Sequence, residues 1–155
     1  MHKCLNVGCG KLHIKSSAIE EWINLDRVTS VNPDIVCDMT QGLPFEDNEI
    51  FYIHAIACLG QIERNEDFLF VMNEFWRILQ PSGMIYIYLP HKDFPHAYVD
   101  PFNQRRFNEL HWAGFDETHQ VYIRHLSYYG FKPWKSVSVT TNEQGFLAIH
   151  MTPSK

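Results

Sequence analysis

Short apolar runs, most of them continuous rather than alternating, recur along the first ninety residues of the chain. Five have the length of a strand, at about residues 4–7, 22–25, 34–37, 51–57 and 84–89. Continuously apolar strands are expected where helices cover both faces of a sheet, as in a parallel, doubly wound arrangement. The pattern therefore predicts an α/β fold with a mostly parallel sheet.

The clearest helix lies between the last two of these runs. From Asn65 onward, Phe68, Met72, Phe75 and Leu79 recur at spacings of four, three and four, which places them on one buried helix face. The sequence Gln80-Pro81-Ser82-Gly83 follows. Proline cannot continue the helical hydrogen bonds and glycine permits a reversal, so the helix is predicted to end there and a strand to begin directly afterward.

The first connection between strands is unusually short, because only residues 11–21 separate Gly10 from the second run. This is near the lower limit of about 10 residues for a parallel crossover. Ser17-Ala18-Ile19-Glu20 has the pattern of a capping box and could start a single helical turn. A shortened first helix would leave the residues around Gly10 uncovered on that side.

The last third of the chain begins with an irregular stretch from Pro90 to about Arg106, which is a candidate substrate loop. A helix is predicted from Asp116 to Gly130, with Val121, Ile123, Leu126 and Tyr129 as its larger apolar residues. Two strands follow at about residues 137–141 and 146–151. Residues 142–145 join them as a hairpin, so the last strand is predicted to be antiparallel.

Length and composition point to one domain over residues 1–155. The net charge is -5 and no run of basic residues stands out, which argues against a nucleic-acid partner. The apolar stretches are too short to span a membrane, and the N-terminus lacks the apolar segment of a signal peptide. We therefore expect a cytoplasmic protein without a membrane partner; its oligomeric state is not readable from the sequence.

The four cysteines, Cys4, Cys9, Cys37 and Cys58, lie far apart and form no C-x-x-C pair. This spacing favours reduced, packed thiols over disulfides or a zinc site.

Two features near the N-terminus indicate a nucleoside cofactor. Asn6-Val7-Gly8-Cys9-Gly10 ends the first apolar run, and Asp26 ends the second. Glycines bring bare backbone against a ligand where a Cβ would collide, and an acid at the end of the neighbouring strand can accept both hydroxyls of a ribose.

Several motifs, in order, resemble those of class I methyltransferases that use S-adenosylmethionine, in particular their small type 11 branch. The matching segments are Leu5-Asn6-Val7-Gly8-Cys9-Gly10, Trp22-Ile23-Asn24-Leu25-Asp26, Asp34-Ile35-Val36-Cys37-Asp38, Leu43-Pro44-Phe45-Glu46-Asp47 and Glu74-Phe75-Trp76-Arg77-Ile78-Leu79-Gln80-Pro81-Ser82-Gly83. A weaker similarity covers Asp100-Pro101 and Arg106-Phe107. The resemblance implies a Rossmann-like sheet and S-adenosylmethionine as cofactor.

The resemblance also implies which residues bind the cofactor. The glycines would line its methionine portion, Asp26 would hold the ribose, and Asp38 and Met39 would flank the adenine. The complete predicted set is Asn6, Gly8, Cys9, Gly10, Asp26, Arg27, Asp38, Met39 and Cys58. The implied reaction is methyl transfer to an oxygen or nitrogen atom of a small molecule or a saccharide.

The chain also departs from the family pattern. Phe51 stands where an acid is usual, and Gly60-Gln61 replaces the usual Glu-His pair in a segment that borders the methyl-transfer site in relatives. A catalytically degenerate module that binds S-adenosylmethionine is therefore the first alternative. A nucleotide-binding oxidoreductase is the second, but His13 stands where the dinucleotide motif G-x-G-x-x-G has its third glycine.

Methyl transfer needs no protein nucleophile, only alignment and, for a protonated acceptor, a base. The loop after the strand at residues 84–89 holds His91, Asp93 and His96, and His91 is the candidate base. The spacing of these residues matches no standard metal site, so no metal ligand is assigned. Aromatic residues crowd the C-terminal third, where they fill the core or line an acceptor pocket.

Overall fold

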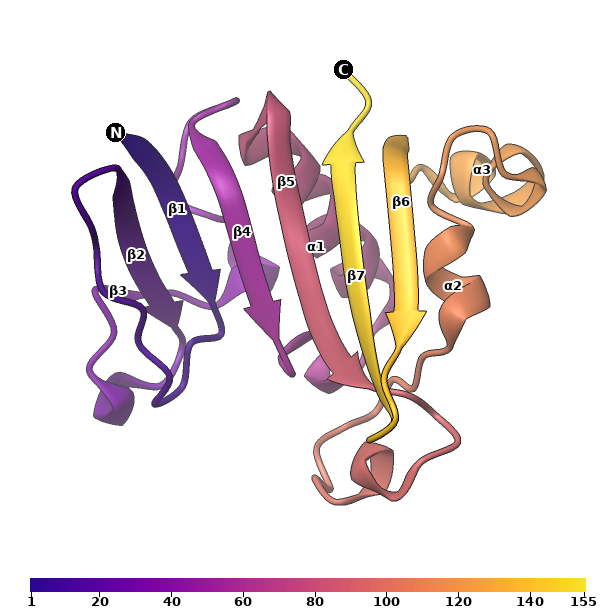
Figure 1. The fold of residues 1–155 in the computed structure, drawn as a ribbon, viewed down its shortest axis with the longest axis horizontal. Helices are drawn as coiled ribbons and strands as arrows, with labels where there is room; N and C mark the ends of the chain where they lie inside the picture. Colours follow the sequence, from indigo (N-terminus) through magenta and orange to yellow (C-terminus); the bar gives the residue numbers. More distant parts are fainter.

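A single sheet of seven strands runs through the molecule, in the order β3-β2-β1-β4-β5-β7-β6, in a computed structural model that describes all of residues 1–155 (Figure 1). The strands are β1 (His2–Val7), β2 (Glu20–Asp26), β3 (Ile35–Val36), β4 (Ile50–Ile56), β5 (Leu79–Pro90), β6 (Trp134–Thr141) and β7 (Phe146–Pro153). All neighbouring pairs are parallel except those of β7, which runs antiparallel to β5 and to β6. The predicted mostly parallel sheet with an antiparallel last strand is confirmed.

The strand order reverses at β1, because the chain moves from β1 to β2 on one side and later to β4 on the other. In open parallel sheets, ligands bind outside the carboxyl ends of the strands at such a reversal. The topology therefore predicts a ligand site among the residues that follow β1, β2 and β4.

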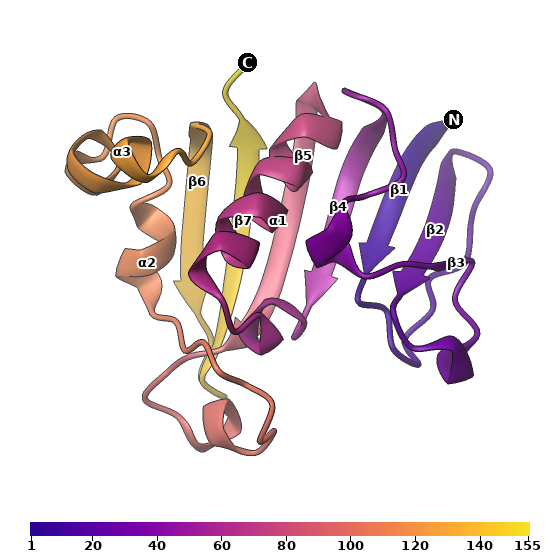
Figure 2. The same ribbon diagram turned by 180° about the vertical axis from the view of Figure 1, so that it is seen from behind.

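Helix α1 (Asn65–Ile78) packs across one face of the sheet (Figure 2). Its buried residues are Phe68, Val71, Met72, Phe75 and Ile78. Three residues of the predicted apolar face are thus confirmed, whereas the fourth, Leu79, lies beyond the helix as the first residue of β5. The short helices α2 (Glu109–Ala113) and α3 (Ser127–Tyr129) lie on the same side, and the opposite face carries no helix (Figures 1 and 2). No helix is both long enough and apolar enough to be a membrane span.

The first crossover contains no helix, so the predicted helical turn at Ser17 is wrong. The Ser17 hydroxyl instead accepts the backbone N–H of Glu20 at 3.2 Å, immediately where β2 begins. Two buried amides hold the crossover to the sheet: Asn6 Nδ2 donates to Leu12 O at 2.7 Å, and Asn24 Oδ1 accepts the N–H of Ile14 at 2.8 Å. These polar side chains satisfy the crossover backbone in place of helical hydrogen bonds.

Helix α1 ends before Pro81 as predicted, but the reversal is part of strand β5. Leu79 already pairs with Ile50, and the next pair in the ladder joins Met84 to Tyr52. Residues 80–83 therefore bulge out of the ladder, which accommodates a proline that cannot donate a hydrogen bond.

The C-terminal helix begins later than predicted. Asp116 lies outside it, where its carboxylate accepts the N–H of Thr118 at 2.9 Å. The helix has a π-helical turn at Tyr122–Leu126 and continues into α3, then ends at Gly130, whose φ of +93° gives the expected left-handed cap. Sequence reasoning missed α2, whose N-cap residue Asn108 forms a capping box with His111.

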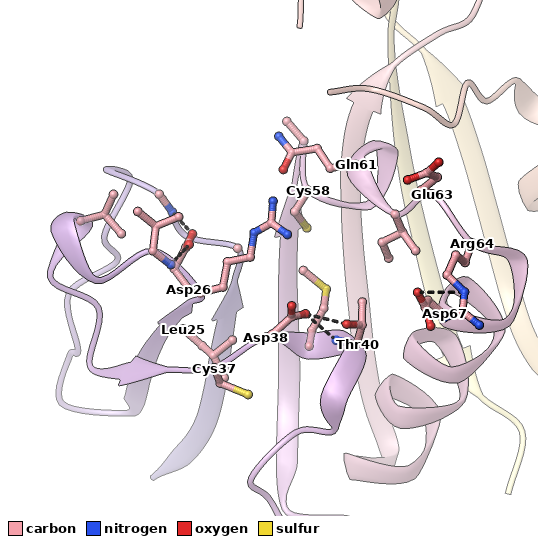
Figure 3. A pocket seen from close by; sticks show the side chains of 18 residues that line it. Leu25, Asp26, Cys37, Asp38, Thr40, Cys58, Gln61, Glu63, Arg64 and Asp67 are labelled. Carbon is pink, nitrogen blue, oxygen red and sulfur yellow. Dashed lines mark hydrogen bonds and ion pairs between the residues drawn. The ribbon is translucent and has the colours of Figure 1, made fainter. Parts of the chain in front are cut away.

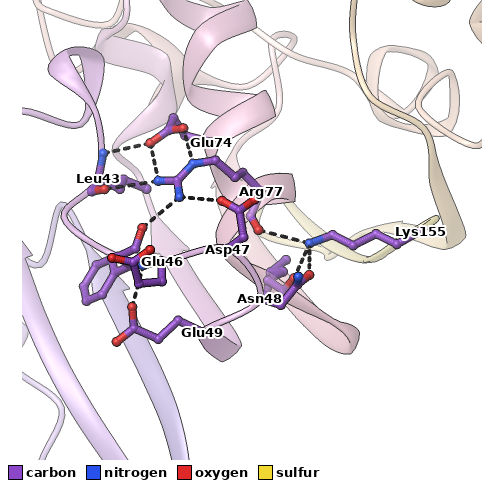
Figure 4. Close-up of polar contacts among 10 residues, drawn as sticks. Leu43, Glu46, Asp47, Asn48, Glu49, Glu74, Arg77 and Lys155 are labelled. Atoms are coloured by element: carbon purple, nitrogen blue, oxygen red, sulfur yellow. Dashed lines mark hydrogen bonds and ion pairs between the residues drawn. The ribbon is translucent and has the colours of Figure 1, made fainter.

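Arg77 joins two of the sequence motifs in one clamp (Figure 4). Its guanidinium donates to Phe45 O at 2.8 Å and to Glu74 Oε1 at 2.6 Å, and Glu74 Oε2 accepts the N–H of Leu43 at 2.9 Å. The hydrogen bond to the Glu74 carboxylate raises the pKa of Arg77 above its usual value. In turn, the Arg77 guanidinium lowers the pKa of Glu74 below its usual value. The loop before β4 is thereby fixed to α1, and both motifs have a structural purpose.

Candidate functional site

A pocket of about 480 Å³ lies at the carboxyl ends of β1 and β2, between the segment after β3 and the start of α1. Figure 3 shows Asp26 and Asp38 on one side of it and Glu63, Arg64 and Asp67 on the other. Its volume is within the range of about 300–1,000 Å³ that is usual for small-molecule sites. The pocket therefore occupies the place that the topology indicates.

The turn after β1 is built from two glycines in the left-handed region, with φ of +63° at Gly8 and +50° at Gly10. A Cβ on Gly8 would lie 2.5 Å from Cβ of Cys58, so only glycine lets the ends of β1 and β4 approach this closely. A Cβ on Gly10 would meet no protein atom within 4 Å, because it would enter open space. Gly10 thus exposes backbone at the pocket.

Asp26 fixes this turn from the neighbouring strand. Its Oδ2 accepts the N–H of Gly10 at 2.8 Å, and its Oδ1 accepts the N–H of Val28 at 2.9 Å. A carboxylate has about four acceptor positions, so both oxygens can still accept hydrogen bonds from a ligand. The acid is held in place by the backbone and lines the pocket.

Asp38 caps the short helical turn Met39–Gln41 on the next wall of the pocket. Its Oδ1 accepts the N–H of Thr40 at 3.0 Å and the Thr40 hydroxyl at 2.8 Å. This fixes the conformation of the segment after β3. Met39 follows directly and also lines the pocket, so an apolar surface stands beside the carboxylate.

Acidic residues outnumber basic ones around the pocket. The carboxylates belong to Asp26, Asp38, Glu63 and Asp67, and the guanidinium groups to Arg27 and Arg64. Arg64 also faces Glu66, and its Nε lies 4.0 Å from Asp67, so part of its charge is offset by neighbours outside and inside the pocket. The local charge favours a ligand with a positive group.

Seven of the nine predicted cofactor-binding residues line this pocket: Gly8, Gly10, Asp26, Arg27, Asp38, Met39 and Cys58. The structure places Asn6 and Cys9 elsewhere, which corrects their expected position. Asn6 is buried and its amide is used to hold the crossover, while Cys9 is buried with its N–H bonded to Leu25 O at 3.1 Å. Both border a second hollow of about 360 Å³, on the other side of the glycine turn.

Cys58 contacts the glycine turn as a thiol. Burial raises its pKa to about 12, so the thiolate form is disfavoured at neutral pH. Its side chain is packed against Gly8, and the preceding Ala57 has a φ of +53°, an uncommon conformation for alanine. The role of Cys58 is to shape the pocket. All four cysteines are free thiols.

His91 does not line the pocket. Its Nδ1 accepts the N–H of Asp93 at 3.1 Å, and its Nε2 lies 3.0 Å from Glu109 Oε2. The residue follows β5 directly and is buried, and its ring meets Phe94 edge to face at 5.7 Å. Both nitrogens are therefore engaged in holding the loop after β5 to α2, an arrangement that does not favour a base.

The Gly60-Gln61 departure has a packing explanation. The carbonyl of Gly60 accepts the N–H groups of Gln104 at 2.8 Å and Arg105 at 2.9 Å, and a Cβ on Gly60 would lie 2.7 Å from Asn103 Oδ1. Glycine thus lets the loop after β5 dock closely on the segment after β4.

Gln61 points its amide to this same loop, donating to Asp100 Oδ2 at 3.0 Å, and it also lines the pocket. The two changes therefore attach the candidate substrate loop to the pocket wall.

Sequence reasoning missed the wall formed by the segment before α1 and its first turn. The residues concerned are Glu63, Arg64 and Asp67, whereas the resemblance had already placed the segment of Gln61 and Ile62 beside the methyl-transfer site. Their one available signal is position, since they follow a strand that neighbours β1. Charged residues at the start of a helix also stabilise the helix itself, so their presence there does not by itself indicate a binding site.

No family model and no curated protein matches the chain in sequence. Among solved structures, a SAM-dependent methyltransferase from Archaeoglobus fulgidus aligns over 97% of this chain and 86% of its own, with 14% identity and a TM-score of 0.70. The YcgJ protein of Bacillus subtilis aligns over 99% and 92%, with 12% identity and a TM-score of 0.66.

A third structure is phosphoethanolamine N-methyltransferase 2 of Haemonchus contortus, in complex with phosphomonomethylethanolamine and S-adenosylhomocysteine. It aligns over 99% of this chain and 49% of its own, with 12% identity and a TM-score of 0.65. The chain thus has the class I fold that SAM-dependent methyltransferases share, with its seven-stranded, mostly parallel sheet.

Proposed function

We propose that the pocket binds S-adenosylmethionine and that the protein transfers its methyl group to an oxygen or nitrogen atom of a small molecule or saccharide. One observation carries the proposal: the Gly10 backbone and the Asp26 carboxylate, from neighbouring strands, meet at the edge of a single acidic pocket. The methyltransferase fold of the chain is consistent with this assignment.

The proposed contacts follow the walls of the pocket. Asp26 accepts the ribose hydroxyls, Asp38 and Met39 flank the adenine, and Gly8 and Gly10 line the methionine portion. Charge-assisted hydrogen bonds to a fixed carboxylate are stronger than neutral ones. Cys58 and Arg27 complete the walls at either side.

The charge of the pocket supports a sulfonium ligand. The surplus of carboxylates over guanidinium groups would stabilise a permanent positive charge. The same surplus would repel a pyrophosphate. A dinucleotide also needs the N-terminus of a helix after the glycine turn, and the first crossover has no helix. The oxidoreductase alternative is therefore disfavoured by both observations.

The bound cofactor would supply an activated methyl carbon attached to sulfur. The protein would then contribute alignment and exclusion of water, which are the main requirements of an in-line displacement. The loop after β5 is attached through Gly60 and through Gln61 of the pocket wall, and it would hold the acceptor. In this proposal His91 positions the loop, and no residue of the chain is assigned as base.

Calorimetric titration with S-adenosylmethionine, S-adenosylhomocysteine and NAD tests the cofactor. We expect binding of the first two and none of the third. Binding of NAD alone would favour the oxidoreductase, and absence of all three would refute the proposed pocket assignment. Release of S-adenosylhomocysteine across a panel of alcohols, amines and saccharides then separates an enzyme from a degenerate binding module, which would bind the cofactor and release none.

A further inference from the structure

The helix-free face of the sheet has no cover from the chain itself over its centre (Figure 1). Sheets whose strands are all parallel occur almost only with both faces covered, and the strands β3, β2, β1, β4 and β5 of this sheet are all parallel. Alternation along each strand separates the two faces: Ile53, Ile85 and Ile149 belong to the core under α1, and their sequence neighbours point to the other side. This other side is called the open face here.

The open face consists mainly of aromatic, aliphatic and uncharged polar residues. Its members are Cys4, Asn6, Trp22, Asn24, Tyr52, His54, Ile56, Met84, Tyr86, Tyr88, Lys135, Ser138, Thr140, Phe146, Ala148, His150 and Thr152, of which Cys4, Asn6 and Asn24 are buried. The central strands β1, β4, β5 and β7 contribute no Lys, Arg, Asp or Glu to it, and Lys135 stands at the β6 edge, opposite Thr152. Glu20 stands at the margin, where its carboxylate accepts the indole N–H of Trp22 at 3.1 Å.

Aromatic rings form a continuous layer at the centre of the open face. Tyr86 stacks on His54 with ring centroids 5.4 Å apart and lies 4.7 Å from His150. Toward the carboxyl end, Tyr88 stacks on Phe146 at 5.1 Å. These residues remain partly exposed. Rigid aromatic side chains that are half covered by their own chain are typical of surfaces that bind another protein.

One buried atom on this face lacks a partner. His54 Nδ1 has no hydrogen bond from any group of the chain. Buried polar atoms in folded proteins are nearly always satisfied, by protein groups or by ordered water, so this nitrogen still needs a partner.

We propose that the open face is the interface of a homodimer, in which a second copy of the chain packs its own open face against it. A twofold contact brings the same residues together, so charge at the centre of the face would repel its copy, whereas this face carries charge only at its edges. Lys135 is a single cation at one edge, which argues against a nucleic acid as the occupant, because phosphate binding depends on clustered cations.

The size of the open face is adequate for this purpose. Six strands at about 4.8 Å spacing and six residues at about 3.3 Å rise give a sheet of about 29 Å by 20 Å. Accessible surface exceeds such a flat projection, and a standard interface buries about 800 Å² on each partner. The face therefore approaches the area of a stable dimer.

The dimer would also cover the back of the glycine turn. The hollow of about 360 Å³ behind Gly8 and Gly10 is lined by His54 and Ile56, which belong to the open face. No helix closes this hollow because the first crossover has none. The second copy would take that place, so the turn would be enclosed only in the dimer.

The test is the mass of the protein by light scattering during size-exclusion chromatography, over a wide dilution range. The wild-type chain should have twice the 18.2 kDa of one copy. Tyr86→Lys places two charges at the centre of the contact and should raise the dimer dissociation constant by at least about tenfold. Tyr129→Lys is the matched control, since Tyr129 is 59% exposed on α3 and should leave the dimer intact.

Circular dichroism and melting curves establish that each variant is folded. If Tyr86→Lys does not fold, His150→Lys provides the same test at a more polar position of the layer. A monomeric wild-type chain would overturn the proposal, and so would a dimer that persists in a folded open-face variant. The measurement needs no cofactor, so its failure is separate from failure of the proposed function.

Discussion

The backbone N–H of Gly10 donates to Oδ2 of Asp26 at 2.8 Å, which links the turn after β1 to the end of β2. The two residues are 16 positions apart in the chain. Because one carboxylate both fixes the turn and lines the pocket, the shape of the pocket and its proposed hold on a ribose depend on the same side chain.

Replacing Asp26 with alanine should weaken S-adenosylmethionine binding by about 10- to 100-fold, since hydrogen bonds to a charged group contribute about 1.5–3 kcal/mol. The thermal shift induced by the cofactor should shrink accordingly. Asp93→Ala is the control, because Asp93 lies on the exposed loop after β5 and outside the pocket. An undiminished shift in the Asp26 variant would show that the ribose assignment is wrong.

Gly10→Ala and Gly130→Ala form a matched pair. Both glycines have positive φ and neither would bring a Cβ within 4 Å of another group, so each substitution should cost about 1–2 kcal/mol of stability through backbone strain alone. Only Gly10 borders the pocket, so only its variant should lose cofactor affinity in calorimetry. Equal affinities for the two variants would contradict the proposed close approach at Gly10.

The Glu74→Gln substitution should destabilise the protein by about 1–3 kcal/mol at pH 7, because it weakens the clamp on Arg77 and Leu43. Arg77 lowers the pKa of Glu74 below its ordinary value of 4.5. A depressed pKa adds stability above the unfolded-state value, and this stability is lost as pH falls through the folded-state value. Urea unfolding of both proteins should therefore give free energies that converge below about pH 4.5.

Glu66→Gln on the same helix is the control for this clamp. Glu66 pairs with Arg64 at an exposed position, so its removal should change the unfolding free energy far less. If the difference between wild type and Glu74→Gln stayed constant down to acid pH, the clamp would not act through the charge of Glu74.

His91→Ala should lower the melting temperature by about 4–8 °C, which corresponds to about 2 kcal/mol lost when Glu109 and the Asp93 N–H lose a buried partner. Cofactor affinity should be unchanged because His91 lies outside the pocket. A pH profile of turnover decides whether His91 only holds the loop or also acts as a base. Loss of the pH dependence of turnover, with the loop still folded and the cofactor still bound, would restore His91 as the base.

The strands and α1 were predictable because each has a local pattern: continuous apolar runs, or apolar residues such as Phe68 and Met72 at helical spacing. Four pocket residues were also predictable, because glycine or acid at the end of a parallel strand suits a nucleoside ligand. The other three, Arg27, Met39 and Cys58, followed only from the family resemblance. The position of Asn6 outside the pocket was not predictable, because a side-chain amide can form hydrogen bonds equally well with a ligand or with the backbone. Its partner, the carbonyl of Leu12, became visible only in the fold.

Failed predictions share a physical cause in long-range contacts. The capping pattern at Ser17 is satisfied by a turn into β2, because the strand competes for the same residues. The closeness of Gly60 to Asn103 joins segments 43 positions apart, and no local pattern encodes such a contact. Helix α2 was missed since it is only five residues long.

The amide contacts that replace the first helix have a thermal consequence. Unfolding the crossover held by Asn6 and Asn24 exposes little apolar surface, because Leu12 and Ile19 are already exposed, whereas unfolding α1 exposes a row of buried side chains. Apolar exposure is what raises the heat capacity of unfolding and curves stability with temperature. The first crossover should therefore keep a nearly even local stability on cooling, while the core under α1 gives the protein most of its sensitivity to cold.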